Sequence, residues 1–423
     1  MSVVLLTGAS GFIGSRLRSA LRDAGHRVIA IRRGSNGQGA FSADFTRDAR
    51  EMHWRPRLAG VDVVVNAAGV FTDRPRGAMK FIHAAGPKAL FSAAAQSGVR
   101  RIIQISAFGA DSRSTEYFET KDEADRHLMT LPIEWAILRP SLVFGLGGRT
   151  ATLLLRLATL PVLLLPRSFR SAVQPVHIDD LVAAVLALVS APNLPREPVP
   201  VVGGRACTMK EFLDILRRQL GYRSASVMLV PDVIMRLLGK LTTLGRQGYL
   251  TRDALKMLRA GYTVNPVSLA TLLGRWPRSP EHFVPRGLAV AVGSEATLGW
   301  LLPLMRWAIA ALWIWSGVVS LGLFPMDESQ ALLARTGMTD AMQAPALLAA
   351  GTLDLLMGLS VLLFYRHAIV WSIQIALVLG YTVILSLWLP EYWLHPFGPV
   401  SKNLPLLACM YLMRRLSLRT WQG

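Results

Sequence analysis

Cysteine is scarce in this chain of 423 residues, which holds only Cys207 and Cys409, far apart and in unlike surroundings. Their spacing fits no metal site, and their scarcity indicates a reducing compartment for the soluble part of the chain. The first residues also lack the basic segment and the long apolar core of a secretory leader. We therefore expect no cleavable signal peptide.

A compact run of lysine or arginine is also absent, although the formal net charge is +19. The arginines are scattered along the chain, and no nucleic-acid-binding motif accompanies them. This pattern argues against nucleic acid as a partner. A positive surface beside the anionic lipids of a membrane explains the excess of basic residues more simply.

Apolar residues make up 52% of the chain, and the mean hydropathy is +0.37, which is high for a purely soluble enzyme. They are distributed unevenly, because everything after about residue 298 is mostly apolar. The length allows two or three domains. The asymmetry predicts a soluble domain followed by a membrane domain.

A glycine-rich loop follows the first apolar run, Val3–Leu6. Gly8 permits a tight turn, Gly11 lets the backbone approach a pyrophosphate, and Gly14 lets helix and strand pack closely. The N-terminus of the following helix, expected over Ser15–Ala24, then favours the negative phosphates. The loop residues predicted to bind the cofactor are Gly8, Ser10, Gly11, Phe12, Ile13 and Gly14.

The choice of cofactor depends on the end of the second expected strand, Arg27–Ile31. An acid at this point usually holds the ribose of NAD, whereas a basic residue accommodates the 2′-phosphate of NADP. The chain has Arg32 and Arg33 there and no acid. Arginine can grip a phosphate with several donors, so NADP(H) is preferred and NAD(H) remains possible. The alternative is that both arginines are simply solvated.

Two further apolar strands, Val61–Val65 and Arg101–Ile105, predict a doubly wound parallel sheet of the α/β class. Asn66 and Ser106 directly follow these strands. Ligands of such sheets sit beyond the carboxyl ends of the strands. Both residues are therefore expected at the site.

Tyr117 and Lys121 are four residues apart, which places them on one face of a helix. A nearby cation favours the phenolate, so we expect Lys121 to lower the pKa of Tyr117 and to make it a proton donor or acceptor. Ser106 would then hydrogen-bond the substrate oxygen. The alternative is an exposed helix face with no chemical role.

These features, with Leu138–Gly145 and Gln174–Leu181, resemble the short-chain dehydrogenase/reductase superfamily over residues 1–290. The closer likeness is to its extended and atypical branches, the NAD-dependent epimerase/dehydratase group and the accessory subunit type of respiratory complex I. The resemblance implies a Rossmann domain with a small substrate-side subdomain.

The same resemblance implies roles for individual residues. Tyr117 is the acid/base, Lys121 also holds the nicotinamide ribose, and Ser106 orients the substrate. Ser112 and Ser114 are rivals to Ser106 in a loop that is shorter than in most extended members. The further implied nucleotide contacts are Asp44, Asn66, Ala67, Ala68 and Gly69. Some members of the complex I branch bind the nucleotide without evident turnover.

Two other segments have structural interpretations. His177, Asp179 and Asp180 fit no common metal site, and the family places them at a strand-to-helix turn where aspartate caps the helix. No metal is therefore expected. The apolar stretch Leu153–Leu165 is too short to span a membrane and is expected in the core. The alternative for Leu153–Leu165 is a surface that dips into lipid.

The last part of the chain predicts about four membrane helices. Trp307–Phe324, Ala344–Tyr365 and Ala368–Leu389 are each long enough to span, and Leu404–Met413 is a shorter fourth candidate. Basic residues gather before the first span, between the second and third, and in the tail. The positive-inside rule then places the N-terminal domain and the C-terminus in the cytoplasm of a bacterial inner membrane.

Residues 298–416 resemble the DoxX-like membrane family. The resemblance rests on Phe324-Pro325, on Leu353-Asp354-Leu355 and on the segment His395–Pro405. Asp354 is unusual because an ionisable group in mid-bilayer normally faces a partner inside the bundle. Arg306, Lys402 and Gln374 are the expected partners. A structural pair and a quinone or proton site are both open interpretations.

The leading hypothesis is a membrane-anchored oxidoreductase of the short-chain type that transfers hydride between NADP(H) and a lipid-soluble carbonyl, alcohol or quinone. A nucleotide-binding scaffold or redox sensor for a membrane partner is the first alternative. An epimerase or dehydratase with tightly held NAD is the second. The expected partners are thus the nicotinamide dinucleotide, the lipid bilayer and a lipid-soluble small molecule. The oligomeric state is left open.

Overall fold

The computed structural model describes residues 1–32, 40–71, 73, 75–166, 171–231, 261 and 263–418. Arg33, one of the two arginines expected at the cofactor, lies outside these residues. The chain divides into two compact units, Met1–Ala296 and Thr297–Gly423, and each has its own architecture.

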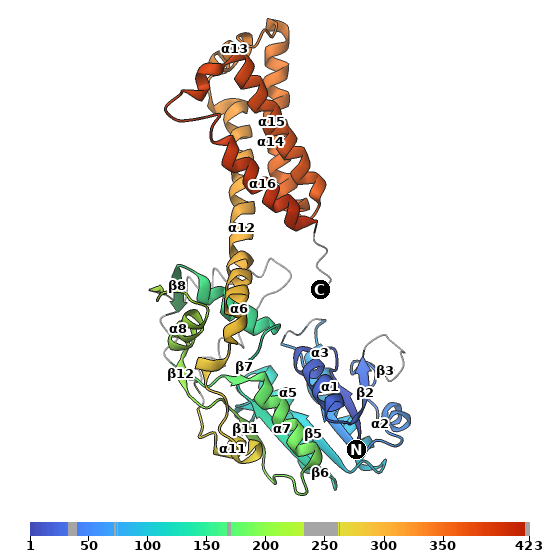
Figure 1. Ribbon diagram of the computed structural model, residues 1–423. Coiled ribbons are helices and arrows are strands. Elements are labelled where there is room, and N and C mark those ends of the chain that lie inside the picture. The colour runs from blue at the N-terminus through green and yellow to red at the C-terminus, as the bar shows by residue number, and fades with distance from the viewer. Residues whose placement is uncertain are drawn as a thin grey trace. The chain divides into compact units, whose positions relative to one another are not determined.

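The first unit is built on a seven-stranded parallel sheet in the order β11-β6-β5-β4-β1-β2-β3 (Figure 1). This confirms the doubly wound α/β fold. Its strands are β1 (Val3–Thr7), β2 (Arg27–Arg32), β3 (Ala40–Ser42), β4 (Val63–Asn66), β5 (Arg101–Ile105), β6 (Glu134–Pro140) and β11 (Val199–Val201).

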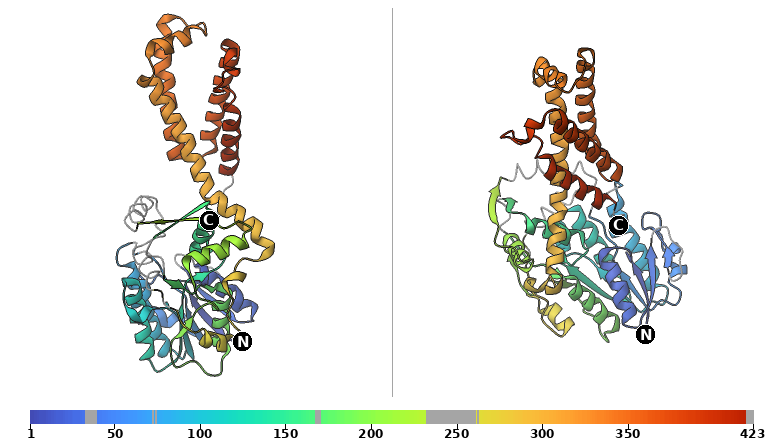
Figure 2. Two further views of the ribbon diagram at one scale, coloured as in Figure 1. Left: turned by 90° about the vertical axis from the view of Figure 1, so that its left-hand side faces the viewer. Right: turned by 45° about the horizontal axis from the view of Figure 1, so that its top comes forward.

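Helices cover both faces of this sheet, which explains why its central strands are almost entirely apolar (Figure 2). One face packs against α1 (Phe12–Asp23), α7 (Ile178–Ser190) and α11 (Val267–Leu273). The other face packs against α2 (Glu51–Trp54), α4 (Gly86–Ala95) and α5 (Glu116–Met129). Burial on both sides removes the polar alternation that a one-sided sheet would show.

The strand order reverses between β1 and β4, and such a reversal opens a crevice at the carboxyl ends of the strands. The register pairs Thr7 with Asn66 and Asn66 with Gln104, so the ends of β1, β4 and β5 lie level with one another. The sheet thereby brings segments from three separate parts of the chain to one edge.

A smaller subdomain of the first unit follows β6. Its described residues form three two-stranded ribbons, in which β7 pairs with β10, β8 with β13 and β9 with β12. Its elements are β7 (Val143–Phe144), α6 (Arg149–Thr159), β8 (Val162–Pro166), β9 (Ala172–Val173), β10 (Val176–His177), β12 (Cys207–Thr208), α8 (Met209–Gln219) and β13 (Ser226–Val230). Buried side chains such as Phe144, Phe212 and Phe283 form a core of their own.

The second unit is helical. Its elements are α12 (Ala289–Val318, which begins in the first unit), a π-helix (Val319–Leu323), α13 (Met326–Ala334), α14 (Asp340–Phe364), α15 (Ala368–Trp388) and α16 (Asn403–Ser417). Small residues let α12 and α14 approach closely, since a Cβ on Gly358 would lie 2.6 Å from the Ile314 side chain.

Three helical runs among the described residues are long and apolar enough to cross a membrane: Arg286–Leu323, Asp340–Phe364 and Ala368–Trp388. They contain the three longer predicted spans almost entirely. The fourth candidate, Leu404–Met413, lies in α16, a helix of 15 residues. At 1.5 Å per residue α16 is about 22 Å long, shorter than a hydrocarbon core of about 30 Å. A fourth span therefore stays a prediction.

Candidate functional site

The glycine loop forms the tight cradle that its spacing predicts. Gly8 has a φ of +66°, in the left-handed region. The turn is closed by the N–H of Gly11, which donates to the Gly8 carbonyl oxygen at 2.9 Å. A Cβ on Gly14 would lie only 2.1 Å from the Gly8 carbonyl oxygen. The loop can keep this shape only with glycine at both positions.

The helix that leaves the cradle begins at Phe12, three residues before the predicted start. Its N-cap is Gly11, and no side chain caps its first turn. Uncapped N–H groups and the helix dipole form a site for an anionic group. The cradle and this helix end therefore fit the pyrophosphate of a dinucleotide, with Ser10 exposed at the turn.

Asn66 ties the strand ends together. It accepts a hydrogen bond from the Thr7 hydroxyl and donates to the Gln104 side chain at 2.7 Å, and it is almost fully buried. Its side chain thus shapes the loop Ala67–Gly69 that follows. The Ala67 backbone lies against Gly8, where a Cβ would meet the Ala67 oxygen at 2.6 Å.

Arg32 and Asp44, two of the residues expected to contact the cofactor, have different environments. Arg32 is partly buried at the end of β2, and its Nε has no hydrogen-bond partner. Asp44 instead accepts hydrogen bonds at 3.0 and 2.8 Å from the N–H and hydroxyl of Thr46. Arg32 therefore has donor capacity available for a ligand, whereas Asp44 stabilises its own turn.

Tyr117 and Lys121 share one face of α5 and are both buried. Thr115 caps the helix by accepting from the Phe118 N–H at 3.2 Å. Lys121 Nζ donates to the carbonyl oxygens of Ala68 at 3.3 Å and Ile105 at 3.1 Å. The lysine therefore joins α5 to the segments at the ends of β4 and β5.

The expected pKa of Tyr117 is wrong in direction. Burial raises the pKa of the phenol above its ordinary value, and Lys121 contributes no lowering. The physical reason is the direction of the lysine, which points its ammonium group at two main-chain carbonyls. Burial also lowers the pKa of Lys121 to about 8, although the nearby Asp125 opposes this shift.

Aromatic rings enclose Tyr117. Phe71 stacks on it with ring centroids 5.1 Å apart, and His83 meets it edge-on at 5.2 Å. Phe71 is itself 65% exposed, so it covers Tyr117 from the solvent side. Sequence reasoning did not single out Phe71 or His83, because neither has a motif that links it to α5.

His83 lies on a π-helical turn, Phe81–Ala85, between α3 (Ala78–Lys80) and α4. Its Nε2 accepts from the Val70 N–H at 2.9 Å, so its Nδ1 carries the proton that faces Thr120 Oγ1 at 3.1 Å. Burial holds the pKa of His83 well below its ordinary value, and the ring is neutral. The ring thereby fixes the loop after β4 against α5.

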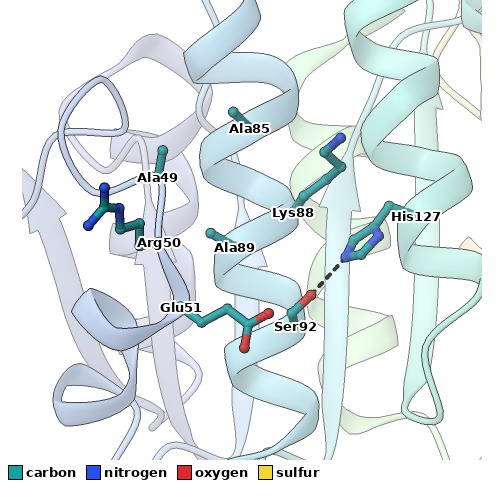
Figure 3. A pocket seen from close by; sticks show the side chains of 8 residues that line it. All are labelled: Ala49, Arg50, Glu51, Ala85, Lys88, Ala89, Ser92 and His127. Atoms are coloured by element: carbon teal, nitrogen blue, oxygen red, sulfur yellow. Dashed lines mark hydrogen bonds between the residues drawn. The ribbon is translucent and has the colours of Figure 1, made fainter.

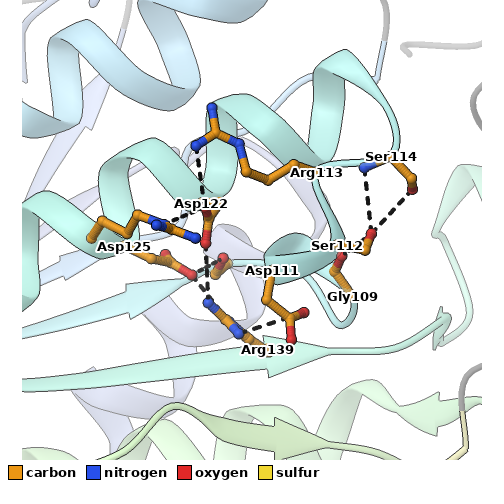
Figure 4. A network of polar contacts seen from close by, with 10 residues as sticks. Gly109, Asp111, Ser112, Arg113, Ser114, Asp122, Asp125 and Arg139 are labelled. Carbon is orange, nitrogen blue, oxygen red and sulfur yellow. Dashed lines mark hydrogen bonds and ion pairs between the residues drawn. The ribbon is translucent and has the colours of Figure 1, made fainter.

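The hydroxyl of Ser106 donates to Asp125 at 2.7 Å. Asp125 belongs to a network of charged side chains with Asp122 and Arg139 (Figure 4). Arg139 lies 3.2 Å from the carboxylate of Asp125 and 3.6 Å from that of Asp122. Because the hydroxyl proton is engaged, Ser106 can accept from a substrate hydroxyl but must leave Asp125 to donate. Asp125 follows Lys121 by four residues, a helical spacing from which it could have been predicted.

The rival serines lie elsewhere. Ser112 and Ser114 hydrogen-bond each other at 3.1 Å in an exposed loop, where Arg113 adopts a φ of +50° (Figure 4). Neither is linked to Lys121 or Asp125. Of the three serines, Ser106 is the one that hydrogen-bonds to Asp125, on the same helix as Tyr117 and Lys121.

A separate groove of about 550 Å³ lies over α4 and α5 (Figure 3). Its lining includes Lys88 and a hydrogen-bonded pair, Ser92 and His127, 2.9 Å apart. His127 follows Tyr117 by ten residues on α5, which is about 15 Å along a helix. The groove contains none of the predicted site residues.

The strand-to-helix turn at His177 forms as expected, but a different residue caps it. His177 Nδ1 accepts from the Asp179 N–H at 3.3 Å, so histidine caps α7 instead of aspartate. Asp180 is fully buried and accepts from Arg275 at 2.5 Å and from the Arg278 N–H at 2.7 Å. In the described part of the chain, no group of three or more acidic, histidine or cysteine side chains is arranged for a metal.

Asp354 in the second unit has partners other than those predicted. It accepts from Ser316 at 2.6 Å and from Tyr381 at 3.4 Å. Gln374 instead accepts from the Trp313 indole at 2.9 Å, and Arg306 lies over the Tyr365 ring. Hydroxyl groups on the two flanking helices thus satisfy the carboxyl group.

Comparison with known proteins agrees with these two architectures. Residues 8–145 match the family described as NAD(P)H-binding, and residues 310–411 match the DoxX-like family. The chain therefore combines an NAD(P)-binding Rossmann domain of the epimerase-like type with a C-terminal DoxX-like domain.

Curated relatives match part of the chain. The mitochondrial NADH-ubiquinone oxidoreductase 40 kDa subunit of Neurospora crassa is 27% identical over 43% of this chain and 48% of its own length. The chain thus spans about half of that subunit. Ceramide reductase of Caulobacter vibrioides is 27% identical over 60% of this chain and 77% of its own. An epimerase family protein of Mycobacterium bovis is 26% identical over 56% of this chain and 84% of its own length.

Solved structures share the fold. Human epimerase family protein SDR39U1 with NADPH has a TM-score of 0.52 at 18% identity, covering 70% of this chain and 99% of its own. UDP-glucuronic acid 4-epimerase of Bacillus cereus, solved with UDP-glucuronic acid and NAD, has a TM-score of 0.52 at 17% identity, covering 69% and 99%.

The buried Lys121 predicts a pH-dependent stability. Its folded pKa of about 8 lies below the ordinary 10.5, so between these values the unfolded chain binds more protons than the folded one. Stability relative to a Lys121→Met variant should therefore rise with pH from 8 to 10.5, by up to about 3 kcal/mol. Melting temperatures measured across this range test the prediction.

The matched control is Lys80→Met, which removes an exposed lysine on α3. Its melting temperature should follow that of the unaltered protein at every pH. If the curves for Lys121→Met and the unaltered protein run parallel from pH 8 to 10.5, the lysine is not buried as described.

Proposed function

We propose that the chain is a membrane-anchored NAD(P)(H)-dependent oxidoreductase of the short-chain type. The observation that carries the proposal is the position of Tyr117 and Lys121. Both lie on α5, near the carboxyl edge of the parallel sheet, where the glycine cradle follows β1. Lys121 donates hydrogen bonds to carbonyl oxygens at the ends of β4 and β5. The geometry of the cradle, with its uncapped helix, fits a dinucleotide.

The residues that would hold the dinucleotide are Gly8, Ser10, Gly11, Phe12, Ile13, Gly14, Arg32, Ala67, Ala68, Gly69 and Lys121, with Asn66 shaping the loop. The nicotinamide, when bound, supplies or accepts a hydride. Tyr117 would give its proton to the substrate oxygen in reduction and take it back in oxidation. Its raised pKa keeps the phenol protonated, which suits the donor role.

The substrate would be a lipid-soluble carbonyl or alcohol, or a quinone. Tethering the catalytic unit to a bilayer raises the local concentration of membrane-borne partners. A relative named ceramide reductase supports this class of substrate. The positive-inside rule supports a bacterial inner membrane with the first unit and the C-terminus in the cytoplasm.

A catalytically weak nucleotide-binding scaffold or redox sensor is the second candidate. It is favoured by the stacking of Phe71 over Tyr117 and by the likeness to a complex I subunit. An epimerase or dehydratase with tightly held NAD is a third candidate, which the absence of an acid after β2 disfavours.

Titration of the detergent-solubilised protein with NADPH and NADH tests the cofactor preference. We expect tighter binding of NADPH, because Arg32 can donate to a 2′-phosphate. Arg32→Ala should weaken NADPH about tenfold or more, as expected for a lost charge-assisted hydrogen bond, and leave NADH within about twofold. Intrinsic fluorescence and thermal shift report both affinities.

The control variant is Arg27→Ala, which removes an exposed arginine at the opposite end of the same strand. It should bind both nucleotides as the unaltered protein does. Equal affinities for NADPH and NADH that Arg32→Ala does not change would refute the preference. Binding of neither nucleotide would refute the oxidoreductase itself.

A further inference from the structure

The ribbon of β8 and β13 exposes large apolar side chains on the first unit. Val162 is 41% exposed, Leu164 39% and Met228 54%. The parallel register pairs Leu164 with Met228, so these two lie side by side on one face. The intervening residues Leu163 and Leu165 are buried in the core of the subdomain.

This alternation divides the ribbon into an inner and an outer face. Adjacent residues of a strand point to opposite sides, so burial of one set leaves the other set outside. Leu229 is also exposed, at 52%, but it directly follows Met228 and therefore points to the opposite side of β13. Leu153–Leu165 was expected in the core, and the structure shows that only part of this stretch is buried.

The stretches of sequence that contain the two strands of the ribbon carry charge of one sign. The sequence has no acidic residue from Arg149 to Ile178, and none from Ile215 to Pro231. Arg156 on α6 and Arg223 before β13 are exposed. Arg217 holds the carbonyls of Leu160 at 2.7 Å and of Arg223, so the segments leading into both strands lie together.

The root of the ribbon also lies beside the segment through which the chain leaves this unit. A Cβ on Gly293, in the first turns of α12, would lie 3.4 Å from the Tyr222 ring and 3.5 Å from the Leu220 carbonyl. Ala296 is buried in the same core as Leu163 and Leu165. Gly293 and Ala296 both belong to the helical run Arg286–Leu323, which is long and apolar enough to span a membrane.

We propose that the ribbon of β8 and β13 is a second membrane contact, which inserts its apolar face among the headgroups of an anionic bilayer. An apolar patch flanked by cations has the chemistry of an interfacial anchor. Anionic lipid complements the charges of Arg156 and Arg223, and each cation near such a surface strengthens membrane binding about fivefold. The proposal rests on insertion of the second unit, which the test measures separately.

The test uses the full chain in nanodiscs, with an environment-sensitive nitrobenzoxadiazole label on a single introduced cysteine. Cys409→Ser removes one native thiol, and Cys207 is buried with the pKa of its thiol raised to about 11, so it resists labelling. Met228→Cys reports on the ribbon. Met52→Cys, at a residue 66% exposed on α2, is the matched control, and Leu379→Cys in α15 reports insertion.

Doxyl-labelled phosphatidylcholine should quench the fluorescence of the labels at residues 228 and 379. Aqueous iodide should quench the label at residue 52. Adding phosphatidylglycerol should increase the quenching of the label at residue 228 by lipid. Arg223→Ala should lower, about fivefold, the ratio of molecules with the ribbon in the bilayer to molecules with the ribbon in water. Leu164→Glu, at an exposed position, should also reduce the quenching by lipid while the thermal melt stays unchanged.

Three outcomes would overturn a claim. If lipid quenches the label at residue 379 but the label at residue 228 is quenched by iodide, as the label at residue 52 is, the second membrane contact does not exist. If 228 is shielded from both quenchers, a protein covers the ribbon and the lipid proposal fails. If 379 is not quenched, insertion of the second unit is refuted, and with it the proposed membrane anchoring.

Discussion

Replacing Gly14 with alanine should abolish tight nucleotide binding. The added Cβ would lie 2.1 Å from the Gly8 carbonyl oxygen and 2.7 Å from its carbon, so the backbone of the cradle must move. Overpacking of this kind costs about 3 kcal/mol, which corresponds to a loss of affinity of about 100-fold. The measurement is the thermal shift produced by NADPH in detergent.

A graded series separates this effect from general destabilisation. A Cβ on Gly11 would lie 3.2 Å from the same oxygen, so Gly11→Ala should weaken binding less than Gly14→Ala. Gly287→Ala, where nothing lies within 4 Å, should leave it unchanged. If Gly14→Ala is folded and binds NADPH as tightly as Gly287→Ala, the cradle is not the nucleotide site.

Replacing Tyr117 with phenylalanine should lower turnover by about 100-fold to 10,000-fold, the usual contribution of a general acid or base. NADPH binding should stay within about twofold, because only the hydroxyl is removed. The assay follows NADPH oxidation with a panel of lipid-soluble aldehydes, ketones and quinones. Tyr411→Phe, at a residue 56% exposed on α16, is the matched control.

The same experiment distinguishes an enzyme from a scaffold. An enzyme loses turnover with Tyr117→Phe and loses both binding and turnover with Gly14→Ala. A scaffold or redox sensor depends on the cradle alone, so Tyr117→Phe would leave its cellular function intact. Unchanged turnover in Tyr117→Phe would exclude this tyrosine as the acid/base.

Part of the site follows from local spacing. Tyr117 and Lys121 share a face because four residues nearly complete a helical turn, and Asp125 continues the same face. The same rule could have identified Asp125 in advance. His83 and Phe71 could not be identified in this way, because they approach Tyr117 from a different segment of the chain.

The electrostatics of the site were not accessible from spacing. The expectation for Tyr117 assumed that the ammonium group of Lys121 lies beside the phenol and lowers its pKa. Burial of both groups reverses the shift, and the carbonyls of Ala68 and Ile105 take up the ammonium. Similarly, Asp354 is satisfied by Ser316 and Tyr381, which no sequence distance brings together.

The sequence by itself determined the glycine cradle, the parallel sheet and three of the apolar helices. Each depends on a short pattern, since backbone freedom, two-sided burial and hydrophobic length act within a few residues to a few turns. The tertiary structure alone decided which groups are desolvated and which partners they meet. It left Val162, Leu164 and Met228 exposed while burying Leu163, because exposure depends on what packs against each face of the ribbon.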